Sequence, residues 1–151
     1  MKLKNPLFAV KDIDKSVKFY QEVLGLHVVM DFGANKTLTG GLVLQTLDTW
    51  KEFISTDPIS FGANDAEIYF EEDDFDQFSE KLKTLNIQHL HPVKEHAWGQ
   101  RIVRFYDPDQ HIIEVGENMK TVCRRFLDSG ITDDEAARRM DVPLKFVKSC
   151  K

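Results

Sequence analysis

The chain has 151 residues, of which 42% are hydrophobic and 30% are charged, and its formal net charge is −5. This length suits one domain, or two half-size modules that share a core, and the composition gives no argument for a disordered chain. The acidic balance and the scattered basic residues argue against a nucleic-acid partner. No apolar run reaches the roughly 18 residues that a membrane span requires, so we expect no membrane partner.

The cysteines and the N-terminus indicate the compartment. Cys123 and Cys150 are the only cysteines, and their spacing is not typical of a zinc site. The N-terminal sequence MKLKNPLFAV has no apolar stretch as long as that of a signal peptide. The sequence therefore predicts a reduced, cytoplasmic protein.

The first 50 residues predict a strand, a helix and then two or three further strands. The helix is expected over residues 14–24, with Asp12 as its N-cap and Gly25 as its C-cap. Gly40-Gly41 offers a tight turn. The strands are expected over residues 2–10, 26–32 and 42–47.

The same order restarts after a polar, turn-rich stretch, residues 49–63, which is expected to be a connector without an element of its own. Asp73 or Asp74 is expected to cap a helix with an apolar stripe, and Asn86 occupies the place that Gly25 had. Strands are expected over residues 66–71, 87–92, 100–106 and 111–116. The chain thus contains a divergent internal repeat of ~55 residues.

Beyond Glu117 the pattern becomes helical. Thr132 and Glu135 form a capping box, and Pro143 is placed to begin a last short turn. Residues 132–147 resemble a helix-turn-helix. The acidic balance favours the alternative, an accessory helical pair that packs on the sheet or on a partner subunit.

Two stretches of sequence resemble the vicinal-oxygen-chelate superfamily, which includes glyoxalases, bleomycin-resistance proteins and extradiol dioxygenases. They are VKDIDKSVKFY followed by VLGL near the N-terminus, and WGQR, FYDPD and IIEV between residues 98 and 115. The resemblance covers residues 3–117. It implies an α+β fold in which two tandem βαβββ modules form a curved mixed sheet, a half-open barrel, with C-terminal accessory helices. The domain would span residues 1–117, with modules 1–50 and 64–117, and the helical extension residues 118–151.

One position departs from the family pattern. Gln110 follows Asp107-Pro108-Asp109, where the family commonly has glycine. If the turn requires a positive φ there, the glutamine is slightly strained.

The resemblance also implies where a metal would be held. Its metal-ligand positions match Asn5, Gln45, Glu67 and Glu114, where the glyoxalase pattern has histidine, glutamate, histidine and glutamate. Without an imidazole the set argues against a dioxygenase iron site. Two carboxylates and two amides suit a hard divalent cation, Mg²⁺, Mn²⁺ or Ca²⁺, better than zinc, so no metal or other cofactor is predicted firmly.

Strand alternation points Glu67 and Tyr69 into the cleft if Ile68 packs beneath the helix. If Glu67 and Glu114 converge without a cation, repulsion raises one pKa, and that carboxylate could act as a general base. Alternatively, each meets an arginine, Arg101 or Arg104, or faces solvent.

Other residues could line the cleft. The aromatic side chains of His96 and Trp98 could rim it and suit a flat ligand, and Arg101 could bind a carboxylate or phosphate or form a surface ion pair. His89 and His91 are expected to share one face of a strand, exposed to solvent. The predicted cleft contains Asn5, Gln45, Glu67, Tyr69, His96, Trp98, Arg101 and Glu114.

The sequence predicts a glyoxalase-like or bleomycin-resistance-like protein that binds a small metabolite or drug in a cleft without the usual histidine ligands. We expect a homodimer, as is usual for the family. The competing class is a divalent-metal-dependent lyase, epimerase or isomerase that uses Glu67 and Glu114. A third class is a dimeric interaction module.

Overall fold

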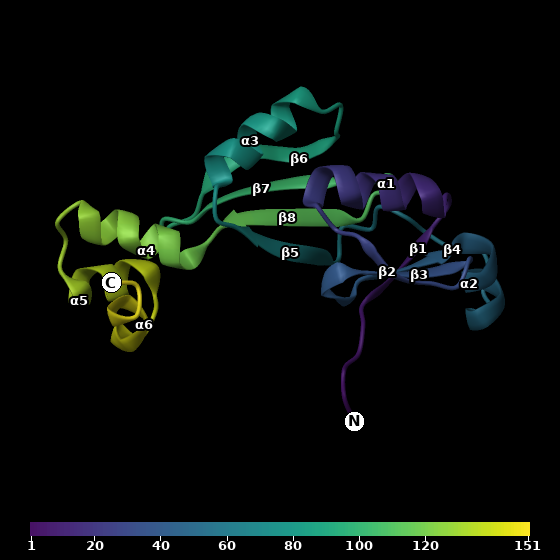
Figure 1. Ribbon diagram of the computed structural model, residues 1–151, viewed down its shortest axis with the longest axis horizontal. Helices are drawn as coiled ribbons and strands as arrows, with labels where there is room; N and C mark the ends of the chain where they lie inside the picture. Colours follow the sequence, from purple (N-terminus) through teal and green to yellow (C-terminus); the bar gives the residue numbers. More distant parts are fainter. The chain divides into compact units, whose positions relative to one another are not determined.

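The computed structural model describes residues 1–151, which form two units with an α+β architecture (Figure 1). The first unit contains residues 1–64 and 107–111, and the second contains residues 65–106 and 112–151. Each unit has one four-stranded mixed sheet, so the predicted pair of tandem modules is confirmed. None of the helices combines the length and the apolar character that a membrane span requires.

The first unit follows the predicted order. Its elements are β1 (Leu7–Val10), α1 (Ile13–Leu24), β2 (Val28–Asp31), β3 (Asn35–Leu38), the 3-10 turn η1 (Thr39–Gly41), β4 (Val43–Thr46) and α2 (Leu47–Ile54). The sheet order is β1-β4-β3-β2, with β1 parallel to β4. The Asp12 carboxylate accepts a hydrogen bond from the backbone N–H of Lys15, and Gly25 ends α1 with a φ of 69°, so both predicted caps are confirmed.

Helix α2 was not predicted. It occupies residues 47–54 and ends at Ser55, which has a φ of 52°. The prediction of a connector over residues 49–63 is therefore wrong in its first part. The turn signals that supported it, Asp57-Pro58 and Gly62, all lie after the helix has ended.

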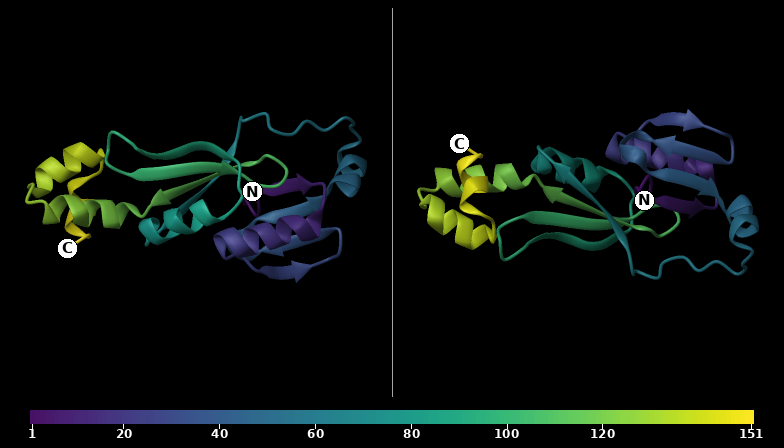
Figure 2. Two further views of the ribbon diagram at one scale, coloured as in Figure 1. Left: turned by 90° about the horizontal axis from the view of Figure 1, so that it is seen from above. Right: turned by 90° about the horizontal axis from the view of Figure 1, so that it is seen from below.

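The second unit repeats the plan. Its elements are β5 (Glu67–Glu72), α3 (Phe75–Thr84), β6 (His89–Glu95), β7 (Arg101–Tyr106) and β8 (Ile112–Glu117), in the sheet order β5-β8-β7-β6. Asp74 caps α3, which covers one face of the sheet (Figure 2) and buries Phe75, Phe78 and Leu82 there. The helix ends at Leu85 with extended backbone, so the predicted C-cap at Asn86 is wrong.

Three further helices follow β8 and lie together at one end of the second sheet (Figure 1). They are α4 (Met119–Asp128), α5 (Asp133–Met140) and α6 (Leu144–Lys148). The predicted capping box of Thr132 and Glu135 is confirmed. These helices share a small apolar core formed by Val122, Cys123, Ala136, Met140, Val147 and Cys150.

Candidate functional site

The second sheet has a helix face and an open face. Phe105 of β7 contacts Phe78 of α3, with ring centroids 6.4 Å apart, and this contact identifies the helix face. Ile113 of β8 pairs with Phe105 and therefore shares its face, and so does Ile68 of β5, which pairs with Ile113. Because side chains alternate along a strand, the residues next to these three point to the other side of the sheet. We call that side the open face, and it carries Glu67, Tyr69 and Glu71 of β5, Ile112, Glu114 and Gly116 of β8, and Ile102 and Arg104 of β7.

Arg104 lies between the two acidic residues predicted to form the site. Its Nε donates a hydrogen bond to Glu67 Oε2 over 2.7 Å, and its Nη2 forms an ion pair with Glu114. Its Nη1 lies 3.4 Å from Nε2 of His91. The hydrogen bond to Glu67 raises the pKa of Arg104, so the guanidinium stays charged. The sequence left open whether Glu67 and Glu114 repel each other, meet an arginine or face solvent. The observed arrangement agrees with the second of these, since both carboxylates contact Arg104.

The two carboxylates differ in exposure. The Glu114 side chain is 8% exposed, whereas that of Glu67 is 38% exposed. A buried carboxylate is stable only when a counter-ion or several donors satisfy it, and for Glu114 that counter-ion is Arg104. Since Arg104 is shared, the three side chains together carry a formal charge of about −1. Glu67 is therefore the partner that a ligand can reach.

A chain of polar contacts leads from the open face to the loop between β6 and β7. The Tyr69 hydroxyl donates to Glu71 Oε1 over 3.1 Å and accepts from Gln100 Nε2 over 2.8 Å. Gln100 Oε1 accepts from Trp98 Nε1 over 3.2 Å, and the Trp98 ring stacks on His96 with centroids 4.1 Å apart. Burial raises the pKa of Tyr69 to about 12, so its hydroxyl remains protonated. Three predicted cleft residues are thus connected through Gln100.

Sequence reasoning did not assign Gln100 and Gly116 to the cleft, and considered Arg104 only as an ion-pair partner. A Cβ at Gly116 would lie 2.8 Å from Gln100 Nε2, so the absence of a side chain there makes room for the chain of contacts. A glycine inside an apolar strand often marks such a close approach. That signal was present in the sequence, whereas the position of Arg104 opposite Glu114 depends on the strand register.

The two histidines of β6 do not share a face. The register shifts between them, so that His89 pairs with Phe105 and His91 pairs with Arg104. Because neighbouring residues of β7 point to opposite faces, His89 lies on the helix side and His91 on the open side. The prediction of a common face is wrong, since strict alternation does not hold across a β-bulge.

Arg101 lies on the helix face, away from Glu67 and Glu114. Its Nη1 donates to Asp76 Oδ1 over 2.6 Å, and its Nη2 donates to Glu117 Oε1 over 3.1 Å. Glu117 is 1% exposed and also accepts from Arg125 Nη2 of α4 over 3.0 Å. Burial alone would raise the pKa of Glu117, but the hydrogen bonds from the two arginines lower it below its usual value. Arg101 therefore forms the ion pairs that were considered as the alternative to ligand binding.

The first unit contains the other two matched positions. Gln45 of β4 is 2% exposed; its Oε1 accepts from Asn35 Nδ2 over 2.7 Å, and its Nε2 donates to the Thr49 hydroxyl of α2. Asn5 precedes β1 and donates from Nδ2 to the Gly41 carbonyl over 2.6 Å. The amide of Gln45 is thus fully engaged within its own unit. The convergence of all four matched positions around one hollow stays a prediction.

The donors at these positions do not fit a bound metal ion. A divalent cation between Glu67 and Glu114 would lie against the Arg104 guanidinium, and like charges at such distances repel strongly. Gln45 would have to give up two hydrogen bonds to turn its oxygen toward a metal. The open face is better described as a set of charged and polar groups that pair with one another, in which Glu114 Oε2 has the charge of Arg104 beside it but accepts no hydrogen bond.

The two stretches that carry the family resemblance meet in the first unit. The Tyr20 hydroxyl of α1 donates to Asp107 Oδ2 over 2.9 Å, and the Lys11 backbone N–H donates to Asp109 Oδ2 over 3.2 Å. His111 Nδ1 also lies 2.8 Å from Asp107 Oδ2. Gln110 has a φ of 69°, so the condition under which strain was expected is met. These motif residues hold the loop 107–111 against α1, so their role is structural.

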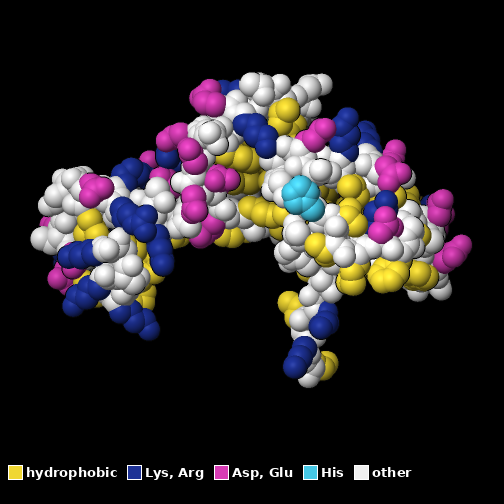
Figure 3. All heavy atoms as spheres, in the orientation of Figure 1, with side chains coloured by type: hydrophobic (Ala, Val, Ile, Leu, Met, Phe, Trp, Pro, Cys, Tyr) yellow, Lys and Arg dark blue, Asp and Glu magenta, His cyan; other side chains and the backbone are white.

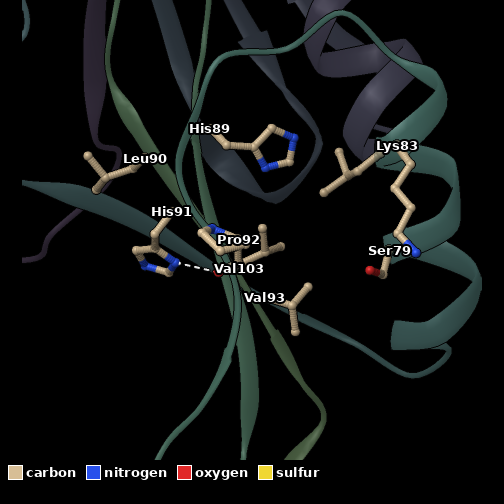
Figure 4. Close-up of a pocket in the computed structure, with 9 residues that line it drawn as sticks. Ser79, Lys83, His89, Leu90, His91, Pro92, Val93 and Val103 are labelled. Carbon is tan, nitrogen blue, oxygen red and sulfur yellow. Dashed lines mark hydrogen bonds between the residues drawn. The ribbon is translucent and has the colours of Figure 1, made fainter.

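A separate cavity of about 480 Å³ lies between α3 and β6 on the helix side of the second sheet (Figure 4). Its walls are mostly apolar, with Leu82, Val93 and Val103 among them. Ser79 and Lys83 lie along its helical side (Figure 4). No residue of the predicted cleft lines it, but His91, which contacts Arg104 on the open side, is one of its lining residues.

Comparisons with known proteins agree with the fold. A glyoxalase-like domain model matches residues 3–120. The metallothiol transferase FosB of Lysinibacillus sphaericus (strain C3-41) is 26% identical over 108 residues, 72% of this chain and 76% of FosB. A protein of unknown function from Agrobacterium tumefaciens str. C58 has a similar structure, with a TM-score of 0.72 and 37% identity over 78% of this chain and 94% of that chain.

The fold is shared more widely. Lactoylglutathione lyase from Agrobacterium tumefaciens has a TM-score of 0.61 and 22% identity over 78% of this chain and 94% of that chain, which shows the fold alone. The domain model covers most of the present chain, including both repeated modules. The chain therefore belongs to the glyoxalase-like family of the vicinal-oxygen-chelate superfamily.

Proposed function

We propose that this glyoxalase-like protein binds a small, flat metabolite or drug on the open face of its second sheet. The observation that carries the proposal is the trio of Glu67, Arg104 and Glu114, in which a buried ion pair supports an accessible carboxylate. Tyr69 on the same face is 45% exposed. Polar groups held in fixed positions beside an aromatic surface are typical of small-molecule sites.

The charge of this face favours a cationic ligand. It carries three carboxylates, Glu67, Glu71 and Glu114, against two cations, Arg104 and Lys94, so its formal charge is −1. The stacked rings of His96 and Trp98 lie at the end of the polar chain and offer a surface for a flat group. We therefore expect a planar ligand with a positive charge or several hydrogen-bond donors, which would bind Glu67 beside the exposed ring of Tyr69.

Benzamidine and benzoate test this proposal, because they have nearly the same shape and opposite charges. We expect benzamidine to raise the melting temperature and benzoate to leave it unchanged. The variant Glu67→Gln should weaken benzamidine binding about tenfold, a loss of ~1.4 kcal/mol. The matched control Glu80→Gln, in an exposed pair with Lys83 on α3, should leave it unchanged.

Two outcomes would contradict the proposal. If benzoate bound and benzamidine did not, the charge argument would be wrong. If the protein purified with a near-stoichiometric metal, or if Mn²⁺ or Mg²⁺ stabilised it strongly and Glu67→Gln abolished that effect, the divalent-metal-dependent lyase, epimerase or isomerase would be favoured instead.

The proposal includes the assembly and the compartment. We propose a cytoplasmic homodimer, in keeping with the family and with two cysteines that remain reduced. Light scattering coupled to size-exclusion chromatography gives the mass in solution. A mass near 17.5 kDa, that of one chain, would contradict the dimer.

A further inference from the structure

The charge of the chain is unevenly distributed along the sequence. Residues 118–151 contain eight Lys and Arg against five Asp and Glu, a net charge of +3, whereas residues 1–117 contain twelve against twenty. Figure 3 shows Lys and Arg side chains gathered over the C-terminal helices. The average charge, which predicted no nucleic-acid partner, therefore does not describe this part of the molecule.

The connection between α5 and the five-residue helix α6 is similar to that of a helix-turn-helix. The two helices are joined by three residues, Asp141-Val142-Pro143, and Asp141 has a left-handed φ of 53°. A turn of three or four residues, often with glycine at its left-handed position, is typical of this motif. Buried side chains on both helices, among them Met140 and Val147, hold the pair together.

The second helix of the pair presents free cations. Lys145 and Lys148 of α6 are exposed, and neither forms an ion pair. Arg124 of α4 donates from Nε to the Cys150 carbonyl over 3.2 Å, which places the basic turn of α4, Lys120 to Arg124, beside the end of α6. Lysine and arginine of α4 and α6 thus both contribute to the basic character of this helical segment.

Three of the five acidic residues of this segment, Asp133, Asp134 and Glu135, lie in the first turn of α5. Asp133 pairs with Lys151 over 2.8 Å, and Glu135 accepts hydrogen bonds from Thr132 in the capping box. Both are in the first turn of α5, where a negative charge stabilises the helix dipole. Asp141 is the acidic residue of the turn itself.

We propose that α4–α6 bind duplex DNA, with α6 in the major groove and Lys120, Arg124, Lys145 and Lys148 on the phosphates. In helix-turn-helix proteins the second helix enters the major groove, and basic side chains around it contact the backbone. The acidic remainder of the chain opposes this association. We therefore expect weak, salt-dependent binding with little sequence preference.

Fluorescence anisotropy of a labelled DNA duplex with the full chain tests the proposal. At about 50 mM salt we expect saturable binding that is lost on raising the salt to about 200 mM. The double variant Lys145→Glu, Lys148→Glu should lower the affinity at least tenfold and reduce the salt slope by about two. The control Lys2→Glu, Lys4→Glu makes the same charge change at the N-terminus and should bind with the wild-type salt slope.

A gain-of-affinity variant complements these losses. Asp141→Asn removes the acidic group of the turn while asparagine tolerates the left-handed conformation, so it should bind DNA more tightly. Circular dichroism should show that all variants retain the wild-type helix content. The proposal is overturned if the wild type does not bind duplex DNA, if both double variants lose binding equally, or if only vesicles of anionic lipid are bound.

Discussion

The Tyr20 hydroxyl donates a hydrogen bond to Asp107 Oδ2 over 2.9 Å, and this bond connects two parts of the chain that are 87 residues apart in sequence. Both residues are buried. Burial and the neighbouring Asp107 carboxylate raise the pKa of Tyr20 well above its usual value, so the phenol is a donor at neutral pH.

Replacing Tyr20 with phenylalanine should therefore destabilise the protein. The variant leaves the buried Asp107 carboxylate with one donor fewer, which costs about 1–2 kcal/mol. Urea denaturation measures the free energy of unfolding. As a control, Tyr69→Phe removes a hydroxyl from a half-exposed position and should cost less than about 1 kcal/mol. If both variants lowered the free energy of unfolding equally, the hydrogen bond to Asp107 would contribute no more than that of an exposed tyrosine.

The Glu117 carboxylate should make stability depend on pH in a defined direction. Because its folded-state pKa is lowered, its contribution is present above the unfolded pKa, about 4.3, and is lost as the pH falls through the folded pKa. At pH 7 we expect Glu117→Gln to cost about 2 kcal/mol, since Arg101 and Arg125 lose a charged acceptor.

Denaturation at a series of pH values checks this expectation. The difference between wild type and Glu117→Gln should shrink as the pH is lowered below about 4 and vanish in stronger acid. The exposed Glu80→Gln variant should differ little from wild type throughout, because surface ion pairs contribute little. A difference for Glu117→Gln that did not change with pH would mean that its cause is packing.

Substituting Gln110 with glycine should stabilise the protein. Gln110 has a φ of 69°, a conformation that costs a residue with a Cβ about 1 kcal/mol more than it costs glycine. Part of this gain is offset by the greater freedom of glycine in the unfolded chain, so we expect a net gain of about 0.5 kcal/mol and a higher melting temperature. In contrast, Gln21→Gly inside α1 should cost about 1 kcal/mol. A loss at both positions would mean that Gln110 is not strained.

The thiol of Cys123 should be nearly inert in the folded protein. Burial raises its pKa to about 12, with a further contribution from the neighbouring Cys150 thiol. Since the thiolate is the reactive form, a disulfide reagent at pH 8 should modify Cys123 roughly a thousandfold more slowly than an exposed cysteine of pKa about 8.5. The variant Cys150→Ser isolates the Cys123 signal, and urea should restore fast reaction. Rapid modification without urea would show that the C-terminal helices open readily.

The sequence by itself determined the local features of the fold. The caps of α1 at Asp12 and Gly25 and the capping box at Thr132 each depend on a few adjacent residues, and all were predicted correctly. Alternation along β5 likewise placed Glu67 on the face opposite to α3. These rules act over distances of one turn or one strand, which a sequence displays directly.

Only the tertiary structure decided which groups meet across strands. The pairing of Arg104 with Glu67 and Glu114 depends on the register of β7 against β8, and the separation of His89 from His91 depends on a bulge in β6. A register shift of one residue turns a side chain to the other face of a sheet. Register results from packing along whole strands, so residues that are distant in sequence acquire their partners only when the sheet has formed.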